Sequence, residues 1–200
     1  MVIPDSVSHI GDYAFQGCNS LKEITIPDSV ISIGSDAFNK TAWYSNQPLG
    51  VVYAGKVVYK YKGTMPSNTS ITIKEGTKSI AARAFSDNTA LVNITIPDSV
   101  IYIGYSAFSY CKALTSVNIG KGIICIDKQA FMDCNSLTSI TIPNGVTSIG
   151  DYALSCTNLS KIVYCGTIGQ WKTIKKGTNW DLSCSSYIVQ CTNGEIEKKK

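Results

Sequence analysis

The strongest constraint on this chain is that it repeats itself every 23 residues. The pentapeptide Ile-Pro-Asp-Ser-Val occurs three times, and a related Ile-Pro-Asn-Gly-Val occurs once. Counted from the leading isoleucine, the units begin at Ile3, Ile26, Ile73, Ile96, Ile119 and Ile142. The second and third of these starts are 47 residues apart, so a repeat array with an irregularity between them is predicted.

Several positions of the repeat are apolar in every unit. The eighth residue is always isoleucine, the twelfth is always alanine, and the thirteenth is phenylalanine in all units but the last. Each unit ends in a Leu-x-x-Ile-x-Ile pattern, whose alternation predicts a short strand with one buried face. A proline usually follows and ends the strand, because it lacks a backbone donor. The Ala-Phe pair, which polar residues flank, favours a single helical turn.

One unit cannot bury these apolar positions alone. Stacking the units places each position against its equivalents above and below, with parallel strands about 4.7–4.9 Å apart. Each fully buried Ile, Leu or Phe then stabilises the fold by about 1.5–3 kcal/mol. The pattern therefore predicts a repeat solenoid of short parallel strands and short helical turns.

The run Leu-x-x-Ile-x-Ile-Pro-x-Ser-Val-x-x-Ile-Gly-x-x-Ala-Phe-x-x-Cys resembles the BspA-like leucine-rich repeats. The resemblance covers residues 3–164 apart from the segment 42–72. It implies a right-handed leucine-rich-repeat superhelix with a parallel sheet on its concave side. It also implies a bacterial surface or secreted protein that is often linked to adhesion. Thr41 and Asn88 replace the pattern's cysteine, and Leu154 replaces its phenylalanine, which concerns the core alone.

We expect residues 1–164 to form the solenoid, with an irregular insertion at 42–72. Within the insertion, Gly55-Lys56 suits the two-residue turn of a β-hairpin. One hairpin face should pack on the solenoid, and it holds Val52, Ala54, Val57, Tyr59 and Tyr61. The other face holds Val51, Tyr53, Val58, Lys60 and Lys62. That second face is either a ligand patch or a solvated face on which lysine stems lie over apolar groups.

Residues 165–200 should form a C-terminal capping segment with a basic tail. A helix is expected over Ile168–Lys176, with Thr167 as its N-cap and Gly177 after its end. Residues 187–189 look like a last strand. Trp171 and Trp180 fit either apolar cover for the open end of the stack or platforms that stack on sugars.

Four of the eight cysteines share one repeat position, and we expect them to be buried, reduced thiols: Cys18, Cys111, Cys134 and Cys156. Cys165, Cys184 and Cys191 lie beyond the repeats, where one disulfide could form. No Cys-x-x-Cys spacing supports a zinc site. Asp5 and Asp28 could share a Ca²⁺ ion, although turn chemistry after proline explains them as well.

Charge and motifs exclude several function classes. The net charge is +4, but the last three residues are lysines, so the body is nearly neutral and nucleic acid is not an expected partner. His9 is the only histidine, and no Gly-rich phosphate loop occurs. We therefore expect no enzyme activity, no cofactor and no metal. We expect neither a membrane span nor a signal peptide within these residues, and because Met1 is followed at once by a repeat, we expect the natural start upstream.

The outward positions of the Leu-x-x-Ile-x-Ile strands are mostly small and hydroxylated. Candidate binding residues there are Lys22, Glu23, Asn93, Thr115, Asn118, Thr138 and Thr141, joined by Tyr53, Lys60 and Lys62 of the hairpin. The favoured hypothesis is a non-catalytic scaffold, extracellular or at the cell surface, that binds a host or neighbouring-cell protein, or a glycan. The alternatives are a structural spacer and a carbohydrate-binding appendage of a larger surface protein.

Overall fold

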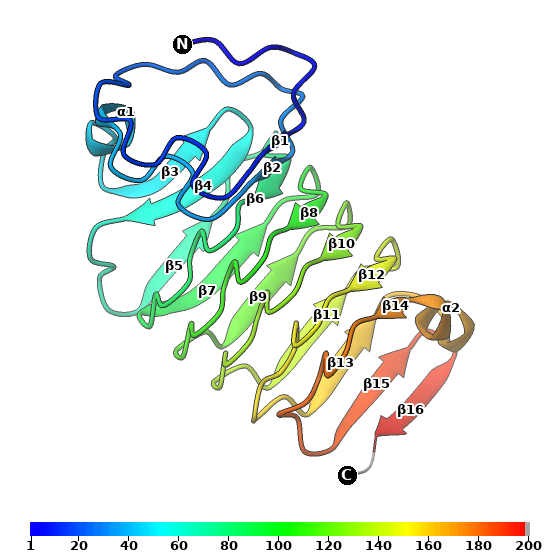
Figure 1. Ribbon diagram of the computed structural model, residues 1–200. Helices are drawn as coiled ribbons and strands as arrows, with labels where there is room; N and C mark the ends of the chain where they lie inside the picture. Colours follow the sequence, from blue (N-terminus) through cyan, green and yellow to red (C-terminus); the bar gives the residue numbers. More distant parts are fainter. Residues whose placement is uncertain (199–200) are drawn as a thin grey trace.

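The computed structural model describes residues 1–198 and is a β-solenoid of about eight stacked turns, here called coils (Figure 1). The N-terminus lies at one end of the stack and the C-terminus at the other. Most coils supply one two-residue strand and one strand of four to six residues, so two series of strands run along the molecule. The repeat solenoid predicted from the sequence is thereby confirmed.

The first series forms the short-strand sheet, whose order is β14-β12-β10-β8-β6-β4-β3. Its members are β3 (Gly50–Ala54), β4 (Val57–Lys62), β6 (Ser79–Ile80), β8 (Tyr102–Ile103), β10 (Cys125–Ile126), β12 (Ser148–Ile149) and β14 (Lys175–Lys176). All neighbours are parallel except the β3–β4 hairpin. The equivalent strands of the first two coils, β1 (His9–Ile10) and β2 (Ser32–Ile33), form a separate two-stranded sheet.

The second series consists of the longer strands. They are β5 (Thr69–Thr72), β7 (Leu91–Ile96), β9 (Ser116–Ile119), β11 (Ser139–Ile142), β13 (Lys161–Tyr164), β15 (Tyr187–Cys191) and β16 (Gly194–Lys198). They pair as β5-β7-β9 and as β11-β13-β15-β16, and β9 lies beside β11. The outward face of these strands is called the long-strand surface below.

The repeat positions stack in register, as predicted. Ile103 pairs with Ile80 on one side and with Ile126 on the other, and all three are fully buried. The phenylalanine rings of successive coils are nearly parallel, with centroids 5.2 Å apart for Phe85 and Phe108. Offset ring stacking of this kind stabilises beyond the apolar area that it buries.

The Ala-Phe segment is not the helical turn that the sequence suggested. In each regular coil this segment makes two tight turns in which residues other than glycine adopt positive φ, as Ser106 (φ 51°) and Tyr110 (φ 59°) do. The amides of Ser106, Phe108 and Tyr110 donate to carbonyls of the next coil at 2.8–2.9 Å. Because these donors are used between coils, an internal helical hydrogen-bond pattern does not form here.

The segment expected as an insertion contains a complete coil. Val57 and Val58 of β4 pair in parallel with Ser79 and Ile80 of β6, the positions that regular coils give to their seventh and eighth residues. The β3 strand precedes β4 through a turn at Gly55, whose φ is +61°. The interval of 47 residues is therefore two coils plus one residue, and the hairpin stands where other coils have their proline turn.

One of the two predicted hairpin faces is correct apart from Tyr61, which is half-buried and packs against the main core. Val52, Ala54, Val57 and Tyr59 are buried against the core of the first two coils. The other face was predicted to be open, but Val58 is fully buried in the main core. The pairing shifts by one residue at a β-bulge after Val52, and the hairpin lies between two cores. Both of its faces are therefore covered in part.

The short-strand sheet and the longer strands continue past residue 165. The helix α2 (Ile168–Thr173) begins with a capping box between Thr167 and Gln170. It is shorter than predicted, because Lys175 and Lys176 extend as β14 and pair with β12. The strand predicted at residues 187–189 is β15, and the outer strand β16, antiparallel to it, was not predicted.

Three of the repeat cysteines are buried thiols that bond the preceding coil. Cys111, Cys134 and Cys156 donate to phenylalanine carbonyls at 2.9–3.1 Å. Cys184 bonds the Leu154 carbonyl in the same way. Cys18 is exposed, contrary to expectation, because its coil is stacked on one side only. All cysteines are free thiols, so Cys165, Cys184 and Cys191 form no disulfide in this structure.

Candidate functional site

Five of the predicted binding residues lie together on the long-strand surface. Asn93 and Asn118 point outward from β7 and β9, Thr141 points outward from β11, and Thr115 and Thr138 lie just before β9 and β11. All five are exposed. Neighbouring strands in a sheet are about 4.8 Å apart, so these side chains form regular rows across the coils.

The polar groups of this surface are partly used between coils. The Asn93 amide donates to Ser70 Oγ at 3.0 Å. The Thr115 hydroxyl donates to the Val92 carbonyl at 3.2 Å, and Ser160 bonds the Thr138 carbonyl at the same distance. The outward residues of β7, β9 and β11 therefore present uncharged hydroxyl and amide groups, whereas β13 and β16 add the exposed charges of Lys161, Glu195 and Glu197. It lacks the exposed Trp, Tyr and Arg side chains that dominate tight interfaces.

Lys22 and Glu23 are exposed but lie apart from this surface. They belong to the first coil, where the long-strand position has an isolated bridge from Val2 to Thr25 in place of a strand. The helix α1 (Ala42–Ser45) takes the place of a long strand in the second coil, and Trp43 donates its amide to the Leu21 carbonyl at 2.6 Å. The rows of strand residues are therefore interrupted between the first coil and β5.

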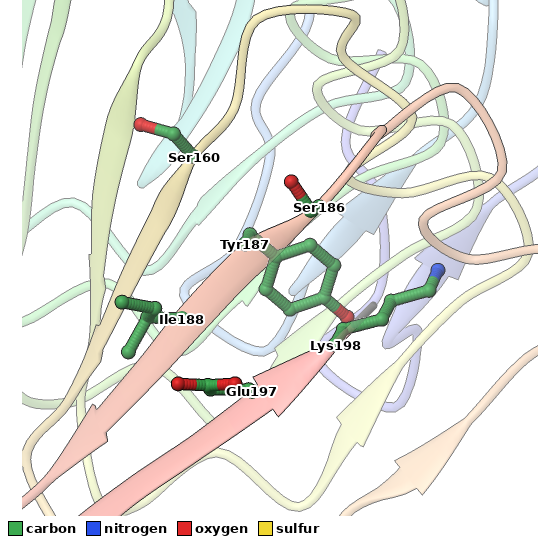
Figure 2. Close-up of a pocket in the computed structure, with 6 residues that line it drawn as sticks. All are labelled: Ser160, Ser186, Tyr187, Ile188, Glu197 and Lys198. Atoms are coloured by element: carbon green, nitrogen blue, oxygen red, sulfur yellow. The ribbon is translucent and has the colours of Figure 1, made fainter. Parts of the chain in front are cut away.

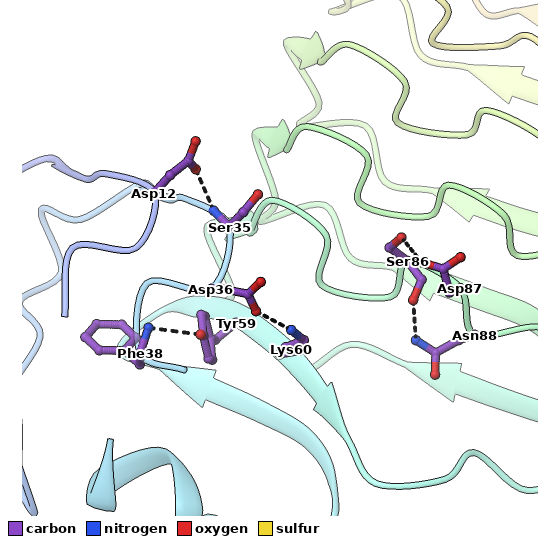
Figure 3. Close-up of polar contacts among 9 residues, drawn as sticks. All are labelled: Asp12, Ser35, Asp36, Phe38, Tyr59, Lys60, Ser86, Asp87 and Asn88. Atoms are coloured by element: carbon purple, nitrogen blue, oxygen red, sulfur yellow. Dashed lines mark hydrogen bonds and ion pairs between the residues drawn. The ribbon is translucent and has the colours of Figure 1, made fainter. Parts of the chain in front are cut away.

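The hairpin residues Tyr53 and Lys60 bond to neighbouring coils. Lys60 Nζ lies 2.6 Å from the Asp36 carboxylate, next to the buried hydroxyl of Tyr59 (Figure 3). The Tyr53 hydroxyl accepts the Lys74 amide at 3.1 Å, and the Lys74 ammonium lies 4.8 Å from the Tyr53 ring centroid. These contacts hold the hairpin in the stack.

Lys62 caps the end of helix α1. Its ammonium donates to the carbonyls of Tyr44, Ser45 and Gln47 at 3.1, 2.6 and 2.5 Å. Carbonyls at the end of a helix have no partner within the helix, and a lysine there is favourable. The side chain is half-buried and fixes α1 against β4.

A depression at the C-terminal end of the long-strand surface was missed by sequence analysis. It has a volume of about 380 Å³ and is lined by Ser160, Ser186, Tyr187, Ile188, Glu197 and Lys198 (Figure 2). Beside it the buried Asp181 accepts from Tyr187 Oη at 2.5 Å and from Lys198 Nζ at 2.7 Å. The alternation of charged and apolar residues from Glu195 to Lys198 was the signal that predicts the missing strand.

The geometry supplies no recognisable catalytic constellation among residues 1–198. His9 is exposed on β1, and its Nδ1 lies 2.7 Å from Ser8 Oγ without an orienting carboxylate. Burial raises the pKa of the Cys111 thiol to about 12 and that of Cys184 to about 11. Both are neutral thiols near pH 7, whereas a nucleophilic cysteine needs a lowered pKa.

Residues 1–198 contain no cluster of three or more His, Cys, Asp or Glu side chains placed to hold a metal ion. Asp28 instead forms an ion pair with Lys56 at 2.5 Å. Within the same residues, no helix has the length and apolar character needed to cross a bilayer.

The sequence matches the family model for the BspA-type leucine-rich repeat region, with six copies over residues 1–47 and 58–176. The unmatched interval contains β3 and the hairpin turn, so the match resumes inside β4. A comparison with curated proteins found no match.

Solved structures of bacterial leucine-rich repeat proteins are similar to this chain. A leucine-rich cell surface protein from Faecalibacterium prausnitzii is 25% identical, with a TM-score of 0.59, over 87% of this chain and 62% of that one. A leucine-rich repeat protein from Eubacterium ventriosum is 26% identical, with a TM-score of 0.51, over 92% of this chain and 42% of that one. The pneumococcal vaccine antigen PcpA shares the fold at 17% identity, with a TM-score of 0.58, over 92% of this chain and 55% of that one. The chain thus spans less than two thirds of each of these proteins.

Proposed function

Because the chain belongs to the BspA-type leucine-rich repeat family, we propose that it is a non-catalytic scaffold that binds another protein at the bacterial cell surface. The proposed partner is a host or neighbouring-cell protein. Two observations support the surface location, namely the family and the description of the Faecalibacterium neighbour as a cell surface protein.

The observation that carries this proposal is the continuous exposed face of β7, β9, β11 and β13. Asn93, Thr115, Asn118, Thr138 and Thr141 are exposed on it among residues 1–198. We propose these five as the contact residues. Since these five side chains are uncharged, they suit a broad polar contact of moderate affinity better than a deep anchor pocket.

The other predicted site residues have different parts in this proposal. Tyr53, Lys60 and Lys62 support the hairpin through their contacts, and Lys22 and Glu23 form a separate patch on the first coil. The carbohydrate alternative receives less support, because Trp171 is buried and Trp180 packs against the core. Neither indole ring is placed as an open platform for a sugar.

The test is binding of the labelled chain to an array of matrix proteins and glycans. The Asn118→Arg/Thr141→Arg variant places two bulky charges on the proposed face. The control is Asn19→Arg/Asn144→Arg, which makes the same kind of change at exposed loop positions. We expect saturable binding to a matrix protein, weakened at least about 10-fold in the first variant, a loss of roughly 1.4 kcal/mol, and unchanged in the control. Equal binding by all three proteins, or binding to glycans alone, would contradict the proposal.

A further inference from the structure

The first two coils fold against the main stack and enclose a cleft with it. The outward sides of β1 and β2 lie opposite those of β8 and β10, and the cleft between them has a volume of about 280 Å³. Its lining residues are His9, Ile31, Ser32, Ile101, Tyr102, Ile124 and Cys125. The Ala82 amide donates to the Ile33 carbonyl at 3.0 Å and holds the two parts together.

The cleft is closed on the side of β6. Ser79 occupies the same outward repeat position as Tyr102, with which it pairs in register. Tyr102 is half-buried, but Ser79 is fully buried, and its hydroxyl has no hydrogen-bond partner among residues 1–198. The first two coils therefore cover β6 and leave β8 and β10 accessible.

Three isoleucines at the sixth repeat position line the cleft, namely Ile31, Ile101 and Ile124. The same position is Ser8 in the first coil, which lines the cleft through His9, and it is Lys78 and Thr147 in two coils that do not line the cleft. Ile124 is 48% exposed in the cleft. The three isoleucines thus bring apolar side chains together at the cleft, and the equivalent Ile174 of the last coil is buried elsewhere.

The polar groups of the cleft are few and mostly engaged. The Tyr102 hydroxyl donates to the Asp127 carboxylate, and His9 Nδ1 is bonded to Ser8. Burial raises the pKa of the Cys125 thiol, so this thiol is neutral near pH 7. None of the seven lining residues is Asp, Glu, Lys or Arg. An occupant would therefore meet an uncharged apolar wall, with His9 Nε2 as one hydrogen-bonding atom.

We propose that this cleft binds a small neutral aromatic molecule of one or two fused rings. An apolar cavity of roughly 150 Å³ accommodates benzene, so 280 Å³ has room for a fused ring system such as indole. Small-molecule sites are typically concave, mostly apolar and located between structural units, with a few polar groups that fix orientation. The cleft has these features and lies on the short-strand side, so the proposal is independent of the long-strand surface.

The probes are indole and 1-methylindole, titrated against the full chain and followed by NMR shifts of backbone amides. Indole should shift amides of β1, β2, β8 and β10 and saturate. Ser32→Trp should abolish these shifts, because the new side chain fills the cleft. Ile124→Ser should weaken binding about 5-fold, whereas Ile188→Ser, at an exposed isoleucine of β15, should leave it unchanged.

The hydrogen bond to His9 gives a second readout. Indole carries an N–H that 1-methylindole lacks, so the chain should prefer indole, and His9→Leu should remove that preference. All variants must keep the denaturation midpoint of the original chain. Saturable shifts that persist in Ser32→Trp, or no shifts at up to about 5 mM indole, would overturn the proposal. A Trp-containing peptide that binds the cleft more than about 10-fold tighter than indole would overturn the small-molecule assignment.

Discussion

Equivalent residues have different environments in the first coil and in the regular coils. Ala107 and Phe108 of the fifth coil are fully buried, whereas Ala14 is exposed and Phe15 is half-buried at the same repeat positions. The residue types are the same, and the number of stacked neighbours differs. Stability in such an array therefore depends on the interfaces between coils as much as on the coils themselves.

At the junction between the second coil and the hairpin, Phe38 is buried by other contacts than those of the regular coils. Phe38 stacks on Phe15 with a centroid distance of 5.4 Å. On its other side it meets Trp43 edge-on at 5.0 Å and Tyr59 edge-on at 5.3 Å. An aromatic cluster from α1 and the hairpin thus replaces the regular ring stack and fully buries Phe38.

The largest expected difference between the two regions concerns phenylalanine. Phe108→Ala should lower the free energy of unfolding by about 3–5 kcal/mol, because it leaves a cavity between two coils. Phe15→Ala should cost less than about 2 kcal/mol, because that ring is already half-exposed. Chemical denaturation of both variants measures the two losses. Similar losses of unfolding free energy in the two variants would show that the number of stacked neighbouring coils does not determine the loss.

The buried thiols predict a loss of stability in alkaline solution. The pKa of Cys111 is about 12 in the folded chain against an ordinary 9.0, so the unfolded chain releases this proton first. Stability that is complete below pH 9 should fall as the pH rises toward 12, by about 2 kcal/mol at pH 10.5 for this thiol. Denaturation curves of Cys111→Ala should lack that part of the decline, and those of Cys18→Ala should keep it. An identical pH dependence in the two variants would refute the assignment.

The Tyr59 hydroxyl should contribute to the junction. It accepts the Phe38 amide at 3.0 Å in the core, so Tyr59→Phe leaves a buried donor without a partner. The expected loss is about 1–3 kcal/mol in the free energy of unfolding. Tyr110→Phe, at a ring that is 39% exposed, is the matched control and should change stability by less than about 0.5 kcal/mol. A neutral Tyr59→Phe would mean that the amide finds another partner.

The smallest effect is expected from ion pairs. The Lys60 and Asp36 side chains are 33% and 24% exposed, and their pair should contribute about 0.5–1 kcal/mol. Lys128 is 61% exposed beside Asp151, so Lys128→Met should cost less than about 0.3 kcal/mol. Thermal denaturation of Lys60→Met and Lys128→Met at low and high salt tests this order, and a larger loss for Lys128→Met would reverse it.

The stacked core could be predicted from the sequence because its positions recur in nearly every coil. The tight turns could not, since Ser106 and Tyr110 are not residue types that signal positive φ. The place of the hairpin in the stack depends on the pairing of Val57 and Val58 with β6. This pairing could not be predicted, because the apolar residues of β4 would have the same sequence pattern in a strand outside the stack.

The candidate surface was predictable in the middle of the stack and not at its end. Asn118 and Thr141 are placed by the repeat itself, so their side chains point outward as expected. Lys22 follows the same pattern, but α1 interrupts the rows of strands beside it. The cleft joins residues as far apart as His9 and Cys125, which only the fold of the first two coils against the main stack brings together.

Hydrogen exchange of backbone amides tests most directly whether the hairpin is an integral coil. The amides of Lys78 and Ala81 donate to the Lys56 and Val58 carbonyls of β4 at 2.7 and 2.8 Å. Their exchange protection factors should be within about 10-fold of those of the equivalent Ile101 and Gly104 amides, which donate to the Lys78 and Ile80 carbonyls of the preceding coil. If Lys78 and Ala81 exchange as fast as loop amides while Ile101 and Gly104 remain protected, the hairpin is an insertion outside the stack.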